Sequence, residues 1–391
     1  MTLGTIGQAV DVPTRETLLA RARALGPELA AARTAANERR DVSPEIVAMI
    51  DRAGLFDILK PRAFGGYEMD PRVFHEVQNV LAESCMSTAW VFGVLSIQVF
   101  VLALFDEGAQ RDVWDEGDGT VLVCSSFMPR GSVVPVEGGY RLRGQWPFSS
   151  GSSHCRWAIV GSTLPAAEPD QPPLRKLFLV PREDYALVDT WRSFGLRATG
   201  SNDVYIDDAF VPAHRSWIMT PGTAIEAGSE VAPLYRLPWL YMFVSCVSNL
   251  SIGAGRGAVA AFIRAQRDVP PRPGAYGSED AAPLAIARAQ AEIEAADMTI
   301  AHHVAAMRGH IAAGTAMAPS EGLLYRAQLT AITRRIAAAV DELMMLTGGR
   351  GIDEDGPLTR SWLDLCAARH HPGNIPDPPA LLLGSNSLGR K

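Results

Sequence analysis

The chain has few cysteines, and none falls in a pattern that builds a disulfide framework or a zinc site. Five cysteines, an odd number, are widely spaced among 391 residues, and no CxxC pair occurs. Disulfide-rich secreted scaffolds and zinc modules depend on closely spaced, paired cysteines, so both classes are excluded. A reducing cytoplasm is the compartment that fits best. The five residues are Cys85, Cys124, Cys155, Cys246 and Cys366.

The chain also lacks blocks of like charge and a recognisable leader. Its net charge of -7 and its pI near 5.7 argue against nucleic acid or an anionic membrane as the main partner. The first residues, MTLGTIGQAVDVPTRE, show no basic start followed by an apolar core. We therefore expect no signal peptide.

One apolar run, residues 89–105, is as long as the shortest membrane-spanning helices. It is single, contains Gln98 in its middle, and is flanked by Glu83, Asp106 and Glu107 without a positive bias. We expect a helix buried on all sides inside a helical domain, and no membrane partner.

Several catalytic and nucleotide-binding motifs are missing. GxSxG is absent and so is a papain-like signature, which argues against hydrolysis by the neighbours His154 and Cys155. The Gly253-Ala254-Gly255 stretch lies in an Ala-rich helical run instead of following a strand. It therefore predicts close helix packing and not a dinucleotide site.

What is present is a change of pattern along the chain. With 47% hydrophobic residues, the chain can bury a large core in two or three domains. Helical patterns cover the first part, with one helix over residues 18–39 and another that starts at Pro44 after an N-cap at Ser43 and ends near Gly54. Closely spaced strand patterns follow, typical of an antiparallel barrel or sandwich of about 100 residues. Long Ala-rich helices return over residues 239–267, 283–314 and 320–346.

Within the strands, residues 138–163 read GGYRLRGQWPFSSGSSHCRWAIVGST. They predict a strand, a Ser/Gly turn and a return strand. The turn, which includes Ser149 and Ser150, is either a solvated hairpin loop or a set of hydroxyl and amide groups that can hold a planar polar ligand.

The order of helices, small β domain and helical bundle resembles the acyl-CoA dehydrogenase fold. Within that fold, the chain resembles the oxygenase components of two-component flavin-dependent monooxygenases. The resemblance implies an α+β protein with an N-terminal α-helical domain (1–119), a middle antiparallel β-barrel or sandwich domain (120–228) and a C-terminal four-helix bundle (229–391). The matching stretches are AGLFDILKPRAFGGYEMDP, STAWVFGV, LALFDEGAQRDVW, GGYRLRGQWPFSSGSSHCRWAIVG, SFGLRATGSNDVYIDDAFVP, LTGGRGI and PLTRSWLDL.

The resemblance implies that a separate flavin reductase supplies FMNH2 or FADH2. The oxygenase would form a flavin C4a-hydroperoxide with O2 and hydroxylate an aromatic or polycyclic small molecule. An acyl-CoA dehydrogenase or oxidase is an alternative, disfavoured because no Tyr-Glu-Gly glutamate follows Asp364. A non-catalytic flavin-binding member of the fold is another. Neither the substrate, the reductase nor the choice between FMN and FAD follows from the sequence.

The resemblance also assigns a flavin site. It places the serine turn against the isoalloxazine ring, with Ser149 and Ser150 as contacts to N5 and the flavin carbonyls. The loop from Gly348 to Gly351 resembles one that meets flavin across a subunit boundary, which implies a homotetramer. No metal site is expected. The complete set of expected flavin contacts is Trp146, Phe148, Ser149, Ser150, Trp157, Gly348, Gly349, Arg350 and Gly351.

Two further residues carry the expected chemistry. His371 matches a family histidine, and an imidazole with an ordinary pKa near 6.5 can take a phenolic proton at neutral pH. Gln98 stands where many relatives carry a second histidine, and an amide orients a hydroxyl or amine but is not a base. The substitution leaves N-oxygenation of an amine open beside hydroxylation of a phenol.

Overall fold

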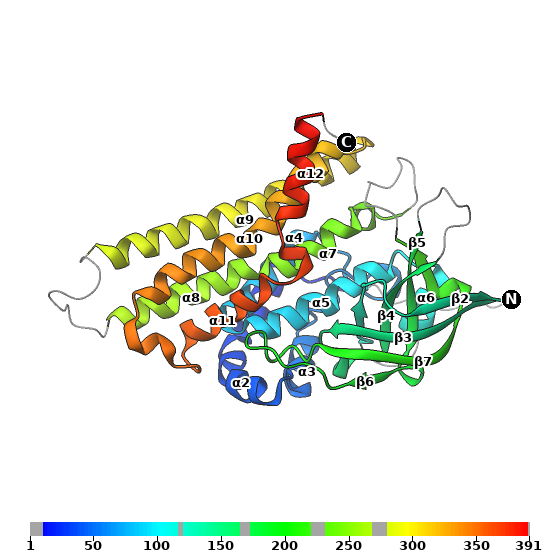
Figure 1. Cartoon of the computed structure of the whole chain (residues 1–391), viewed down its shortest axis with the longest axis horizontal. Helices are drawn as coiled ribbons and strands as arrows, with labels where there is room; N and C mark the ends of the chain where they lie inside the picture. The colour runs from blue at the N-terminus through cyan, green and yellow to red at the C-terminus, as the bar shows by residue number, and fades with distance from the viewer. Residues whose placement is uncertain (1–10, 116–119, 165–172, 220–230, 268–279, 390–391) are drawn as a thin grey trace.

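The structure, a computed structural model, describes residues 11–115, 120–164, 173–219, 231–267 and 280–389. The β strands gather at one end of the molecule and the long helices extend to the other (Figure 1). Helix α5 runs between these two parts. This arrangement confirms the α+β fold predicted from the sequence. The predicted domain boundaries, 119/120 and 228/229, fall at the edge of or within segments outside the described ranges, so they stay predictions.

The N-terminal part is helical, as expected, but its first helix is interrupted. A helix over residues 18–39 was expected; the structure has two, separated at Leu25, because Pro27 cannot continue the first helix and instead opens the second. The Ser43 hydroxyl caps the next helix as predicted, accepting from the amide of Ile46 at 3.3 Å. The helices are α1 (Arg15–Ala24), α2 (Gly26–Arg39), α3 (Pro44–Arg52), α4 (Pro71–Ser84), α5 (Met86–Leu102) and α6 (Glu107–Trp114).

Helix α5 is the apolar run considered above as a membrane span. Every one of its residues except Val94 is buried inside the protein, which confirms the expected core helix. By length and composition alone, another helical stretch, Trp239–Arg267, could cross a membrane, yet 78% of its apolar 18-residue window is buried within the structure. That is typical of a core helix.

The middle part contains two four-stranded sheets, in the orders β1-β4-β5-β8 and β2-β3-β7-β6. All neighbouring strands are antiparallel except β1 and β4, which are parallel. The strands are β1 (Val123–Ser126), β2 (Ser132–Val136), β3 (Gly139–Ser149), β4 (Trp157–Leu164), β5 (Leu174–Pro181), β6 (Ala186–Val188), β7 (Asn202–Pro212) and β8 (Ser216–Ile218).

The serine segment is not a hairpin, which corrects the expectation of a return strand. Strand β3 pairs with β2 and β7, whereas β4 pairs with β1 and β5, so the chain passes from one sheet to the other at the serines. Sequence periodicity finds both strands but does not show which partners they take. The crossing places the serines at the edge of the β part and against α5.

The C-terminal part is a helical bundle in which α8, α9 and α10 pack on one another and α11 packs on α8 and α10. Gly253 allows α8 to approach α4, because a Cβ there would lie 2.1 Å from the carbonyl oxygen of Asn79. The predicted close packing at that glycine is confirmed. The helices are α7 (Trp239–Ser248), α8 (Leu250–Arg267), α9 (Ala281–Ala313), α10 (Pro319–Met345), α11 (Pro357–Ala368) and α12 (Asp377–Ser387).

Candidate active site

Trp90 on α5 joins two of the sequence-predicted site residues. Its indole Nε1 donates a hydrogen bond to the hydroxyl of Ser150 at 3.1 Å. Its ring also meets the ring of His371 edge-on, with 5.4 Å between centroids and an interplanar angle of 72°. Three segments that are far apart in the chain therefore meet at one indole: α5, the crossing between the sheets and the loop after α11.

The serine turn packs tightly on α5 at Gly151. This glycine has φ +68°, and a Cβ there would lie 3.0 Å from a methyl group of Val91. Its amide donates to the carbonyl of Thr199 at 2.8 Å, which ties the turn to the segment before β7. A larger residue at Gly151 would both strain the backbone and push the turn away from the helix.

From Ser150, a chain of hydroxyl groups runs inward. The oxygens of Ser150 and Ser201 are 2.7 Å apart, and those of Ser201 and Thr199 are 2.6 Å apart. Thr199 donates to the carbonyl of Leu196 at 2.9 Å. Ser201 and Thr199 are buried, whereas Ser150 is half-buried and is thus the member open to a ligand.

The inner end of this chain is held by a buried carboxylate. Asp364 on α11 accepts a hydrogen bond from the Leu196 amide at 2.6 Å and another from the Ser87 hydroxyl at 3.4 Å. Burial raises the pKa of Asp364 to about 6, although these hydrogen bonds and nearby arginines act in the opposite direction. Helix α11 therefore fixes the serine side of the site through Asp364 and leads into His371.

His371 begins a short 3-10 turn (Pro372–Asn374) and accepts at Nδ1 from the Gly373 amide at 3.0 Å. Asn374 fastens this turn by donating to the carbonyls of Val247 and Ala368, both at 2.9 Å. His371 is half-buried, and desolvation of its ring lowers its pKa to about 4 because the charged form loses hydration. The imidazole is therefore neutral at physiological pH.

Aromatic rings continue from His371 away from the serines. The ring of Phe243 on α7 lies 6.3 Å from that of His371, and the ring of Phe127 lies 4.8 Å from Phe243. Phe127 and Phe243 are partly exposed, as is Val94 on α5. Together with the buried Trp90 they form an apolar group beside His371.

Gln98 lies on the same face of α5 as Trp90 and Val94, at successive steps of four residues. Its side chain is fully buried, and its Nε2 donates to the Val94 carbonyl at 3.1 Å. Its Oε1 has no hydrogen-bond partner among the described residues. A buried acceptor without a donor is costly, so this oxygen is suited to a ligand's O–H or N–H group.

Some of the expected flavin contacts do not lie at the turn. Trp146 is fully buried between the sheets and donates to the Gly161 carbonyl at 2.6 Å. Trp157 is also buried, and the guanidinium of Arg215 covers its ring at 4.9 Å. Their expected contacts with flavin stay predictions, because alternation along a strand does not distinguish a core face from a ligand face.

The expected contacts Ser149 and Phe148 differ in their exposure. Ser149 is fully buried and lies beside the thiol of Cys124, inside the β part, so the Ser150 hydroxyl is the more available of the two. Phe148 is 63% exposed and has φ +65°, a strained conformation for a residue with a side chain. Its ring is edge-on to that of Trp191 at 6.3 Å. Phe148 thus remains a candidate contact next to the serines.

The loop from Gly348 to Gly351 follows α10 at the end of the bundle away from the β strands (Figure 1). Gly348 and Gly349 are exposed. The position of the Arg350 side chain lies outside what the structure describes. The loop lies apart from the strands that flank the serine turn, so its expected contact with flavin stays a prediction (Figure 1).

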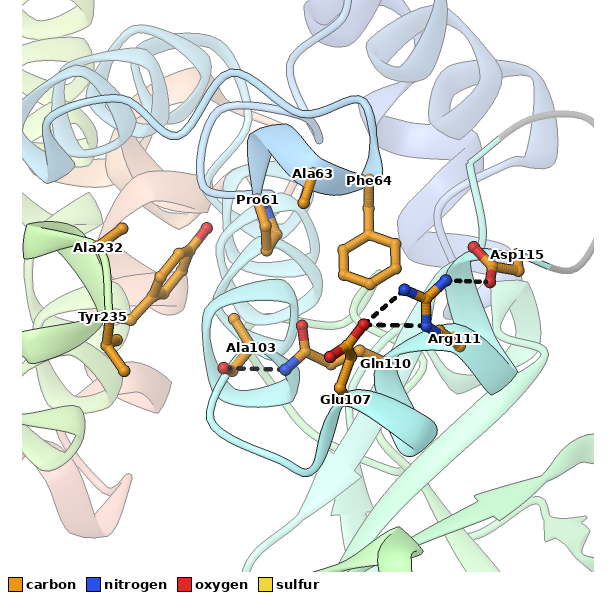
Figure 2. Close-up of a pocket in the computed structure, with 11 residues that line it drawn as sticks. Pro61, Ala63, Phe64, Ala103, Glu107, Gln110, Arg111, Asp115, Ala232 and Tyr235 are labelled. Carbon is orange, nitrogen blue, oxygen red and sulfur yellow. Dashed lines mark hydrogen bonds and ion pairs between the residues drawn. The ribbon is translucent and has the colours of Figure 1, made fainter. Parts of the chain in front are cut away.

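Two surface pockets lie outside this group of residues. One, of about 440 Å³, is lined by Tyr235 on one side and by Phe64 and Arg111 on the other, with Arg111 held by Glu107 and Asp115 (Figure 2). It contains none of the expected site residues.

The other pocket, of about 450 Å³, is close to the serine turn. Its Asn202 pairs with Ser149 in the β3–β7 ladder, and its Asp41 accepts from the Ser153 hydroxyl at 2.6 Å. The remaining lining residues are Arg39, Arg40, Asp189, Trp191 and Arg192. This pocket is polar and carries three guanidinium groups.

Sequence reasoning did not find Trp90, Thr199, Ser201 or Asn374. The first three lie in stretches that carried the resemblance, STAWVFGV and SFGLRATGSNDVYIDDAFVP, which was the available signal. Their roles depend on contacts with residues far along the chain, which no local pattern shows.

Comparison with known proteins gives matches over nearly the whole chain. Residues 245–375 match the family described as acyl-CoA dehydrogenase, C-terminal domain. The flavin-dependent monooxygenase oxygenase subunit HsaA of Mycobacterium tuberculosis is 33% identical over 380 residues, covering 96% of each chain. The oxygenase component of the FADH(2)-dependent resorcinol hydroxylase of Rhizobium sp. is 32% identical, covering 90% of this chain and 89% of that protein.

Among solved structures, XiaF from Streptomyces sp. in complex with FADH2 and glycerol superposes with a TM-score of 0.87. It is 27% identical, and the match covers 96% of each chain. The similarity thus extends through the helical and β parts alike.

Proposed function

Because the chain belongs to the family of oxygenase components of two-component flavin-dependent monooxygenases, we propose that it hydroxylates a phenolic aromatic compound with FADH2 and O2. Members of this family are enzymes that use reduced flavin. The reaction balances as FADH2 + O2 + Ar–H → FAD + H2O + Ar–OH. The observation that carries the proposal is the contact of Ser150 and His371 with the same indole, Trp90.

The residues present fit a reduced flavin at the serine turn. Ser150 is half-buried and open to a ligand, and the buried Ser152 hydroxyl has no hydrogen-bond partner among the described residues. The exposed ring of Phe148 offers an apolar surface beside them. When bound, reduced flavin supplies the two electrons that activate O2.

The polar pocket beside the turn suits the charged tail of the cofactor. Arg39, Arg40 and Arg192 line it together with Asp41 and Asp189, and Asp189 pairs with Arg192 at 2.8 Å. Arg39 and Arg40 are therefore the candidates for phosphate contacts, since guanidinium groups bind phosphate oxygens well. The printed names of two relatives, the resorcinol hydroxylase and XiaF, include FADH2. We therefore propose FADH2 and not FMNH2 as the cofactor of this chain. A separate reductase would supply it, as the term oxygenase component implies.

His371 is placed to hold the substrate hydroxyl. The neutral ring accepts from Gly373 at Nδ1, so its hydrogen lies on Nε2 and can be donated to a phenolic oxygen. A hydrogen bond to that oxygen orients the aromatic ring and stabilises the negative charge that develops on it. Removal of a phenolic proton by His371 stays a prediction, and its pKa of about 4 makes the ring a weak base for that step.

N-oxygenation of an amine is the second candidate. It is favoured by the unpartnered Oε1 of Gln98, which can accept from an N–H group as readily as from an O–H group. Substrate panels that pair each phenol with the matching arylamine separate the two reactions.

The homotetramer also remains a proposal. It is supported by the exposed Gly348 and Gly349, whose loop lies at the end of the bundle away from the β strands (Figure 1). Light scattering on the purified protein tests it: a monomer that binds FADH2 at low micromolar concentration would contradict it.

The test of the function uses isotopically labelled oxygen. Protein is mixed anaerobically with FADH2 and then with ¹⁸O2 and resorcinol or another simple phenol, and products are analysed by mass spectrometry. We expect one ¹⁸O atom in the aromatic product. Recovery of all O2 as H2O2 across a panel of phenols and arylamines would contradict the proposal, with protein-free FADH2 as the control.

A further inference from the structure

The hydroxyl chain at the serine turn has one hydrogen arrangement that satisfies all of its contacts. An indole N–H only donates, so Ser150 accepts from Trp90. A carbonyl only accepts, so Thr199 gives its hydrogen to Leu196. Ser201 then donates to Thr199, and Ser150 donates to Ser201. Three hydroxyl hydrogens fill three oxygen–oxygen contacts, and none remains for a ligand.

This arrangement leaves Ser150 with one unused lone pair. Toward a ligand the hydroxyl is therefore an acceptor. To donate outward with the contacts inside the chain kept, Ser150 would need its own hydrogen and those of Ser201 and Thr199 all to turn. The Thr199 oxygen would then face the Leu196 carbonyl at 2.9 Å with no hydrogen between them. The cost is about one buried hydrogen bond.

Flavin N5 changes its hydrogen-bonding character with oxidation state: it carries a hydrogen in reduced flavin and a lone pair in oxidised flavin. We infer that the hydroxyl chain makes the serine turn selective for reduced flavin. Ser201 and Thr199 are positioning residues in this scheme, since both are buried and act only by fixing the hydrogen of Ser150. The inference rests on the proposed function, because it places the N5 side of the flavin at Ser150.

The selectivity explains how an oxygenase can release its product cofactor. FAD formed at the end of the reaction has lost the N5 hydrogen that Ser150 accepts. The N5 lone pair of FAD then faces the lone pair of the Ser150 hydroxyl, which favours dissociation of FAD and its return to the reductase. Binding of the next FADH2 restores the hydrogen bond.

The first test is Ser201→Ala. Without Ser201, the Ser150 hydrogen has no inward acceptor and is free to donate to N5 of oxidised FAD. We expect the ratio of Kd for FAD to Kd for FADH2 to fall about three- to tenfold, the equivalent of one hydrogen bond. Both constants are measured anaerobically, FAD by its fluorescence and FADH2 by ultrafiltration.

Thr199→Val provides a second variant of nearly the same shape. It removes the acceptor of Ser201, so turning the remaining hydrogens no longer leaves a contact unfilled, and the ratio should fall in the same way. Thr199→Ser retains a hydroxyl and should restore the parent ratio. The matched control is Ser251→Ala, which removes a buried hydroxyl paired with Thr333 at 2.9 Å within the bundle. Melting temperatures show which variants are folded.

The outcomes distinguish a failure of this inference from a failure of the proposed function on which it rests. If Ser150→Ala weakens FADH2 binding but Ser201→Ala and Thr199→Val leave the ratio unchanged, the inference is overturned and the flavin site stands. If the parent protein binds neither FAD nor FADH2, the proposed function itself fails. A fall in the ratio for both variants, with none for Ser251→Ala, supports the inference.

Discussion

The amide of Gly373 donates to Nδ1 of His371 at 3.0 Å, which places the hydrogen of the neutral ring on Nε2. In this tautomer His371 can donate a hydrogen bond from Nε2. To accept a proton it must use Nδ1 and give up the bond to Gly373. The arrangement thus favours a hydrogen-bond donor over the base expected from an unperturbed imidazole.

The first prediction concerns the pH dependence of oxygen transfer. Burial lowers the pKa of His371 to about 4, so the ring stays neutral from there upward. Coupling, the product formed per FADH2 consumed, should be flat between pH 6 and 8 as far as His371 is concerned, and should fall only as the pH approaches 4. A change in coupling centred near pH 6.5 that is absent in His371→Ala would contradict this prediction. Single-turnover assays across the pH range give the profile.

A second prediction is the size of the effect of removing the ring. Loss of one donor to a developing charge should lower oxygen transfer about 10- to 100-fold in His371→Ala. Loss of a general base would cost up to about 10⁴-fold. His371→Gln, which keeps an N–H donor, should recover part of the rate. Product yield and H2O2 release, measured together, report the loss as uncoupling.

A third prediction concerns Asn374, which holds the turn that follows His371. Asn374 is 1% exposed and donates to two backbone carbonyls, while its Oδ1 accepts from Ser248 at 2.7 Å. Asn374→Ala leaves these buried groups without partners, so the free energy of unfolding should fall by about 2–4 kcal/mol. Urea unfolding measures it. Asn386→Ala, on an exposed part of α12, is the control and should change little.

The fold was largely predictable because its signals are local. The Ser43 cap, the strand periodicities and the glycine packing on α8 each depend on a few neighbouring residues. The break at Leu25 was missed because helix propensity on both sides of Pro27 is high. The crossing at Ser150 was missed because strand pairing is decided by contacts distant in sequence.

The site was predictable only in outline. The resemblance brought Ser150 and His371 into the same site, and both contact Trp90. It could not show that Trp146 faces the core, because a buried tryptophan and a ligand-stacking tryptophan share the same strand pattern. Nor could it show that the His371 pKa is lowered, since that depends on burial by α5 and α7.

A fourth prediction uses the buried carboxylate of Asp364. Its pKa is raised from 3.8 to about 6 in the folded protein, so the unfolded chain loses this proton first as the pH rises. The contribution of Asp364 to stability is therefore most favourable below pH 4, declines between pH 4 and 6, and stays at its lower level above pH 6. Two pKa units correspond to about 3 kcal/mol.

Asp364→Asn tests this dependence without changing the shape of the side chain. The amide oxygen can still accept from Leu196, but the group no longer titrates. The stability of the variant relative to the parent should therefore increase by about 2–3 kcal/mol between pH 4 and pH 7. Urea unfolding at four or five pH values gives the difference. A difference that does not vary with pH would mean that Asp364 is not perturbed.

The last prediction concerns Gln98, whose buried Oε1 lacks a partner among the described residues. An unpartnered acceptor costs about 1–3 kcal/mol in the free protein. Gln98→Leu, of similar volume, should therefore raise the free energy of unfolding by about 1 kcal/mol, after the loss of the bond to the Val94 carbonyl is subtracted.

If the oxygen receives a substrate hydrogen, the same variant should bind resorcinol or the matching arylamine about tenfold more weakly, as judged by the concentration that gives half-maximal coupling. Val94→Leu, which changes the same helix face without touching the amide, should not increase stability in this way. A Gln98→Leu protein that is more stable and equally coupled would show that the amide has no part in substrate binding.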